Sequence, residues 1–203
     1  DFFPSLNARV IRAFLARAVA AGQLSAEPAT INALVRLACR ANVHDGSFAL
    51  SIGAPSSPFL SNAILFDFDS ALTSSAKSLN CVYTRYADDL YLSGKSFADV
   101  RATEERLREL VGSLLPYLRL NARKTQHMSR KRRVSVTGLV VTPERRTSVG
   151  RDLKRSMKTR TYLATIGQLP AEELGWLRGM LAFVRGAEPA FFSSLQQKFG
   201  EEA

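Results

Sequence analysis

Two adjacent carboxylates, Asp88 and Asp89, are the residues of this sequence best suited to chemistry. They interrupt a segment, 83–93, whose aromatic and β-branched residues favour two short strands around a tight turn. Because side chains alternate along a strand, a reversal here can bring both acids to one end of the sheet. Paired carboxylates suit a divalent cation such as Mg²⁺, which binds carboxylate and phosphate oxygens. An inert acidic turn is the simpler alternative, since Asp is common in turns.

The composition points to a polyanionic partner. The chain has 203 residues, 46% of them hydrophobic, enough for one large or two small domains. Its 28 Lys plus Arg against 18 Asp plus Glu give a net charge of +10, which suits nucleic acid or an anionic surface. No apolar run is long enough to span a bilayer, and no signal-peptide pattern opens the chain. The only cysteines, Cys39 and Cys81, make no disulfide framework or metal cluster, so a reducing cytoplasm is the simplest expectation.

The spacing of apolar residues predicts the elements that must position the two acids. Helical periodicity covers about 5–20, 28–40 and 97–114, and the apolar run 63–72 indicates a largely buried helix. A short strand leading into a turn is expected over 118–125, a strand over 134–141, and three helices over 147–203. The change from mixed to all-helical sequence near 145–150 is the expected domain boundary.

Basic residues gather after the hairpin. One cluster precedes the strand at 134–141 and consists of Arg130, Lys131, Arg132 and Arg133. A second set recurs at i, i+3, i+4 and i+7, which puts Arg151, Lys154, Arg155 and Lys158 on one helical face. Leu153 and Met157 lie on another face. Such a helix can follow a nucleic-acid backbone while packed on a core, and a simple solvated face is the alternative.

The motifs, taken in order, resemble those of bacterial reverse transcriptases, especially the retron enzymes. Residues 83–90, which include Tyr86-Ala87-Asp88-Asp89, resemble the catalytic hairpin. Gly53-Ala54-Pro55 resembles the motif under the nascent base pair and incoming nucleotide. Asn121 followed by Lys124 resembles the next motif, which implies that Lys124 lies near the triphosphate. Val136-Thr137-Gly138 matches a retron signature in a region that helps to recognise the cognate RNA.

The resemblance also implies a fold. We expect an α+β chain: a palm with an antiparallel sheet backed by helices over 1–146, then an all-α thumb over 147–203, with the fingers and the start of the palm missing. The opening residues 1–6 resemble the tail of the first catalytic motif. The family's first catalytic Asp would lie three residues before Asp1, so Asp1 is not expected to be a metal ligand. Phe3 then takes the steric-gate position, where an aromatic ring excludes a ribose 2′-OH.

The function implied is an RNA-directed DNA polymerase, a nucleotidyltransferase that copies its own structured RNA into DNA. Asp88 and Asp89 would be catalytic and would hold two Mg²⁺ ions, with Mn²⁺ as a substitute. The nucleotide pocket would contain Phe3, Gly53, Ala54, Pro55, Tyr86 and Lys124. Nucleic-acid binding would fall to the two basic sets with Thr137 and Gly138. Partners would be an RNA template, an RNA–DNA duplex, dNTPs, a cognate structured RNA and an effector protein, with no membrane involved.

Two alternatives stay open. Ile52 stands where the family usually has Gln before the glycine, which allows a catalytically silent RNA-binding scaffold with the same fold. The intact pair Asp88 and Asp89 argues against that scaffold. A group II intron or defence-associated reverse transcriptase is the enzymatic alternative, and residues 130–138 favour the retron type over it. Because the first acid would lie upstream, we expect these 203 residues by themselves not to polymerise.

Overall fold

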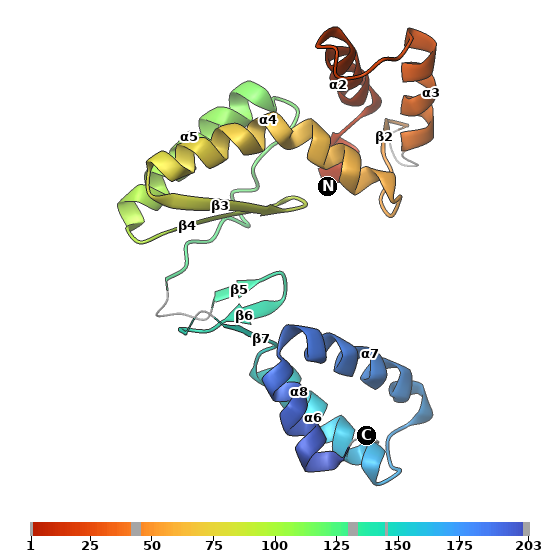
Figure 1. Cartoon of the computed structure of the whole chain (residues 1–203), viewed down its shortest axis with the longest axis vertical. Helices are drawn as coiled ribbons and strands as arrows, with labels where there is room; N and C mark the ends of the chain where they lie inside the picture. The colour runs from red at the N-terminus through yellow and green to blue at the C-terminus, as the bar shows by residue number, and fades with distance from the viewer. Residues whose placement is uncertain (1, 42–45, 130–133, 145, 201–203) are drawn as a thin grey trace. The chain divides into compact units, whose positions relative to one another are not determined.

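The computed structural model describes residues 2–41, 46–129, 134–144 and 146–200. The chain forms two compact units, Asp1–Arg123 and Lys124–Ala203, and each is described by itself. Small antiparallel sheets alternate with helices along the chain (Figure 1), so the predicted α+β class is confirmed. Among the described residues, no helix is both long enough and apolar enough to cross a bilayer.

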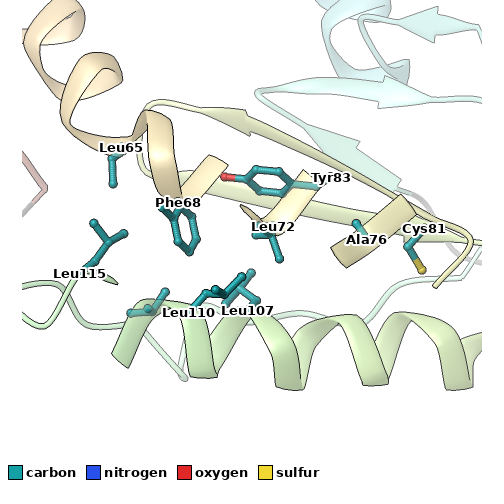
Figure 2. Packing of buried hydrophobic residues seen from close by; sticks show 10 residues of the cluster. Leu65, Phe68, Leu72, Ala76, Cys81, Tyr83, Leu107, Leu110 and Leu115 are labelled. Atoms are coloured by element: carbon teal, nitrogen blue, oxygen red, sulfur yellow. The ribbon is translucent and has the colours of Figure 1, made fainter. Parts of the chain in front are cut away.

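The first unit places one hairpin under two long helices. Its elements are α1 (Phe2–Ser5), α2 (Ala8–Ala20), α3 (Pro28–Ala38), β1 (Cys39–Ala41), β2 (Phe48–Leu50), α4 (Ser56–Ser78), β3 (Cys81–Tyr86), β4 (Asp89–Gly94) and α5 (Phe97–Leu114). α4 packs along β3, and α5 packs on both α4 and β4. Figure 2 shows Phe68 and Leu72 of α4 facing Leu107 and Leu110 of α5, with Tyr83 of the hairpin beside them. This apolar layer holds the hairpin against the helices.

A second core in the same unit joins α2 and α3 to the start of α4. The amphipathic helices expected over about 5–20 and 28–40 are observed as α2 and α3, and Ile11 and Val35 are fully or almost fully buried. Both are shorter than expected: α2 begins only after its cap Asn7, and Cys39 and Arg40 belong to β1. The side chain of Asn7 caps α2 by accepting hydrogen bonds from the amides of Arg9 and Val10 at 3.0 and 3.1 Å. Cys39 and Cys81 are both buried and do not form a disulfide.

The second unit is a three-helix core with a small sheet attached. Its elements are β5 (Val134–Val136), β6 (Leu139–Val141), β7 (Thr147–Ser148), α6 (Arg151–Thr165), α7 (Ala171–Ala187) and α8 (Pro189–Phe199). Met157 and Val184 are fully buried at its centre. β7 is tied to the end of α7, because the Thr147 hydroxyl donates to the Ala187 carbonyl at 2.9 Å. The boundary between the two units, at Arg123 and Lys124, therefore precedes the small sheet. The all-helical part of the chain begins later, at α6. The division into palm and thumb at 146 stays a prediction.

Two sequence expectations about strands were wrong. The single strand expected over 134–141 is a hairpin, because Thr137 and Gly138 have φ of 48° and 86° and turn the chain between β5 and β6. The strand expected at the start of 118–125 is absent from these described residues. There Leu118 donates its amide to the Leu115 carbonyl at 2.8 Å, and Leu118 and Leu120 pack on the core beside the hairpin instead of pairing with a strand.

Glu188 links the sheet to the helices of the second unit and should make that unit sensitive to acid. Its carboxylate accepts from the Val149 amide at 3.0 Å and from Lys154 Nζ at 2.5 Å. Burial raises the pKa of Glu188, but the hydrogen bonds from Lys154, Val149 and Ser148 outweigh it, so the pKa lies below its ordinary value of 4.5. The resulting stability is present above that value and is lost as pH falls through the lower folded pKa.

We predict that Glu188→Gln lowers the free energy of unfolding of this unit by about 1–3 kcal/mol at neutral pH. The variant should also lose less stability than the wild type between about pH 5 and pH 3. Urea denaturation followed by the fluorescence of Trp176, the only tryptophan, reads this unit directly because Trp176 lies on α7. Identical pH profiles for variant and wild type would contradict the assignment.

Candidate catalytic hairpin

The tip of the β3–β4 hairpin carries both acids. The strands pair antiparallel from Cys81↔Gly94 to Tyr86↔Asp89, which leaves Ala87 and Asp88 as a two-residue loop. Asp89 is the first residue of β4, and both carboxylates are exposed. The strand–turn–strand arrangement expected from the sequence is thus observed. Ala87 has φ of 52°, a left-handed conformation that normally favours glycine.

The two faces of the hairpin differ. Alternation turns Cys81, Tyr83 and Arg85 towards α4 and α5. The opposite face is open within the described residues: Val82 is 60% exposed and Tyr86 is 67% exposed. Tyr86 pairs directly with Asp89, so an aromatic ring and a carboxylate share this open face. An extended ligand can therefore lie on this face next to the acids.

The pair Asp88 and Asp89 fits part of a magnesium site. Within the described residues, neither carboxylate is engaged in a hydrogen bond or ion pair, so their oxygens can accept a cation. Mg²⁺ usually takes one or two protein carboxylates and fills its remaining positions with water and substrate phosphate oxygens. The part of the chain that the structure describes holds no group of three or more His, Cys, Asp or Glu side chains that could bind a metal. The hairpin thus offers two ligands.

The Gly-Ala-Pro loop is fixed at the start of α4. The Ser57 hydroxyl, which is fully buried, donates to the Ser51 carbonyl at 2.6 Å, and the Ser57 amide donates to Ala54 at 3.1 Å. Gly53 has φ of 86°, and the position that a Cβ would take meets no described atom within 4 Å. The backbone conformation therefore favours glycine here, and the space beside it is open. Ile52 is 71% exposed, so its apolar side chain faces solvent.

Two other residues expected in the nucleotide pocket are Phe3, in the first unit, and Lys124, in the second. Phe3 is half-buried, contacts Phe2 in a tilted arrangement with ring centroids 5.4 Å apart, and packs on the α2–α3 core. Lys124 is exposed in a turn and is the first residue of the second unit. Their roles in a nucleotide pocket stay predictions. The basic cluster Arg130, Lys131, Arg132 and Arg133 lies outside the described residues.

The basic face of α6 is present but is not uniform. Arg151, Arg155 and Lys158 are exposed. Lys154 is partly buried, with 31% of its side chain exposed, and its ammonium binds Glu188 and lies 5.2 Å from the Phe191 ring centroid. The charge of Lys154 is therefore matched within the protein. Arg151 and Arg155 present theirs to solvent, and the Lys158 ammonium lies 5.9 Å from the Phe191 ring centroid. Thr137 and Gly138 are exposed at the β5–β6 turn.

Sequence reasoning missed a polar network directly behind the acids. Arg85 of β3 binds Asp69 of α4, whose Oδ1 also accepts from the Tyr83 hydroxyl at 2.7 Å. Burial, then the hydrogen bond to Asp69, raises the pKa of Tyr83, and the Asp69 hydrogen bonds raise the pKa of Arg85. The phenol and guanidinium therefore remain donors at neutral pH. Strand parity could have shown that Arg85 lies on the buried face and needs a carboxylate there, but not that Asp69 supplies it.

Comparison with known proteins finds similarity to curated reverse transcriptases. No family model matches the sequence. The chain is 32% identical to the Retron Ec83 reverse transcriptase of Escherichia coli over 158 residues, which are 77% of the chain and 51% of that protein. It is 30% identical to the Retron Ec86 reverse transcriptase of the same organism over 210 residues, 99% of the chain and 60% of that protein.

A relative from another organism agrees. The chain is 30% identical to the Retron Mx162 reverse transcriptase of Myxococcus xanthus over 216 residues, 94% of the chain and 43% of that protein. The chain spans about half the length of the curated relatives it matches. Over most of its length the chain is similar to retron-type reverse transcriptases, as its motifs indicated.

The α6 face yields a prediction that separates binding from folding. Arg155→Ala should lower affinity for an RNA duplex and reduce the slope of log affinity against log salt by about 1, because one phosphate contact is lost. Its thermal stability should be unchanged, since Arg155 is exposed. Lys154→Ala should mainly lower thermal stability, because Glu188 loses its partner. Salt-dependent filter binding and thermal denaturation of both variants provide the measurement. An unchanged salt slope in Arg155→Ala would exclude this face from phosphate binding.

Proposed function

We propose that the protein carrying this chain is a retron-type reverse transcriptase that copies a structured RNA into DNA. The observation that carries the proposal is the exposed pair Asp88 and Asp89 at the tip of a tight hairpin, with its carboxylates unengaged within the described residues. The relatedness to several retron enzymes supports the same chemistry. An inert acidic turn would need neither the open face beside Tyr86 nor the supporting network behind it.

The chemistry would be nucleotidyl transfer. The primer 3′ oxygen bonds to the α-phosphorus of a dNTP, the bond to pyrophosphate breaks, and the hydroxyl proton is released. Two bound Mg²⁺ ions, or Mn²⁺ in their place, would supply charge neutralisation for this in-line displacement. Asp88 and Asp89 would hold that charge at the hairpin tip, and the family pattern puts a third carboxylate upstream of Asp1. Tyr86, which pairs with Asp89, would support the primer end from the open face.

The remaining candidates divide between nucleotide and nucleic acid. The loop at Gly53, Ala54 and Pro55, with Phe3 and Lys124, would contact the incoming dNTP. The exposed cations of α6 and the cluster 130–133 would bind backbone phosphates of the RNA–DNA duplex, with shape rather than base sequence being read. Thr137 and Gly138 at the β5–β6 turn would help to recognise the cognate structured RNA. An effector protein is a further proposed partner.

A catalytically silent RNA-binding scaffold is the second candidate, and Ile52 favours it. The family usually has Gln at this position, and an exposed isoleucine supplies no polar group to a nucleotide. A scaffold would keep the fold and the basic faces while losing synthesis. The unengaged acids at the hairpin tip favour the enzyme instead.

The test is primer extension on an RNA template with Mg²⁺, using the full-length polypeptide that carries this chain. Asp88→Asn should abolish extension, lowering the rate by about 10³-fold or more, because a metal ligand becomes a neutral amide. Asp67→Asn is the matched control, since Asp67 is an exposed carboxylate of α4 on a different helix face from Asn62 and Asp69. It should retain wild-type activity.

The alternatives give different results in this assay. Tight RNA binding without any Mg²⁺-dependent extension, on generic and cognate RNA alike, would favour the scaffold. Full activity in Asp88→Asn would contradict the assignment of the site. The 203 residues alone should not extend a primer, and efficient synthesis by them would refute the need for an upstream acid.

A further inference from the structure

Arg85 lies next to the acidic turn and donates hydrogen bonds to Asp69, Asn62 and Ala87. The proposed polymerase chemistry assigns no role to this side chain. It lies on β3, two residues before the loop, with only 9% of its side chain exposed. One edge of its guanidinium binds the Asp69 carboxylate of α4: Nε donates to Oδ1 at 3.0 Å and Nη2 donates to Oδ2 at 2.5 Å. This two-bond pairing fixes the guanidinium plane relative to α4.

The other edge of the same guanidinium points at the turn. Its Nη1 donates to Asn62 Oδ1 at 3.0 Å and to the backbone carbonyl of Ala87 at 3.1 Å. Asn62 and Asp69 both lie on α4, seven residues apart and thus on the same face of that helix. Arg85 therefore links a rigid helix to the peptide that joins Ala87 to Asp88.

The Ala87 peptide needs such a restraint. Its φ of 52° is one that alanine rarely adopts, because the side chain then crowds the backbone. Strained residues persist where their surroundings over-determine them, and such positions cluster at functional sites. The Ala87 carbonyl is held by Arg85, so rotation of this peptide would break a hydrogen bond to a charged donor. The peptide also sets the direction in which Asp88 leaves the turn.

We propose that Arg85 is a positioning residue for the catalytic acids: anchored on Asp69, it fixes the Ala87 peptide and thereby the orientation of Asp88 and Asp89. This inference rests on the proposed polymerase function. If Arg85 only held β3 against α4, the hydrogen bonds from its Nε and Nη2 to Asp69 would be sufficient. The edge that faces the turn is what distinguishes positioning from stabilisation.

The test compares Arg85→Lys with Arg106→Lys in the full-length polypeptide. Lysine keeps the positive charge but cannot hold Asp69 and the Ala87 carbonyl at once, since it lacks the planar fork. Arg106 is the matched control, because it forms a 2.7 Å pair with Glu109 on the exposed face of α5. Hydrogen–deuterium exchange of residues 84–91 reports the turn without reference to activity. A peptide from α5 reports the overall stability of the unit.

Arg85→Lys should raise exchange at 84–91 while leaving the α5 peptide protected, and Arg106→Lys should change neither. In primer extension, Arg85→Lys should lower kcat by about a hundredfold, as expected for misplaced catalytic groups, with the KM for template–primer unchanged. Wild-type exchange at the turn would overturn the proposal. A loss of protection spread equally over the turn and α5 would reduce Arg85 to a structural role and would also overturn it.

A second variant keeps the test decisive if Arg85→Lys does not fold. Asp69→Asn preserves the shape of the side chain, which is 26% exposed, but removes the charge that anchors Arg85. It should raise exchange at 84–91 in the same way, and an unchanged turn would refute the positioning role. If the wild type extends no primer, the polymerase proposal fails, whereas the exchange measurement still decides whether Arg85 holds the turn.

Discussion

The guanidinium of Arg85 lies almost entirely out of water, and this buried charge fixes how β3 meets α4. A guanidinium that is mostly out of water needs a carboxylate partner, so the register that joins Arg85 to Asp69 is favoured. Apolar burial around Phe68 and Leu72 supplies the packing, but that force has no direction. The ion pair and the Tyr83 hydroxyl turn general packing into one defined position for the hairpin.

α4 consequently serves two parts of the candidate site. Its first turn holds the Gly-Ala-Pro loop through Ser57, and its middle holds the acidic turn through Asn62 and Asp69. Pro55 and Asn62 are about 10 Å apart along the helix axis. A single rigid helix therefore spaces the proposed nucleotide loop from the acids, which is the kind of support that catalytic geometry requires.

The sequence was sufficient to predict those helices and strands in which the spacing of apolar residues reflects one buried face. The helix expected at 97–114 is observed as α5 with those bounds, and alternation in 83–93 put both acids at the hairpin tip. The turn at Thr137 was missed, because a β-branched residue rarely has positive φ and the flanking valines read as one strand. The partner of Arg85 was missed because Asp69 lies 16 residues earlier on another element, so only tertiary packing brings them together.

The most direct test of the account is whether the acidic turn binds a divalent cation. Mn²⁺ titrated into the isotopically labelled chain should broaden the amide resonances of Ala87–Leu90 by paramagnetic relaxation. The effect should vanish in a variant with Asp88→Asn and Asp89→Asn, while Asp67→Asn keeps it. Broadening that leaves the turn untouched, or that survives loss of both acids, would contradict a metal-dependent function for this hairpin.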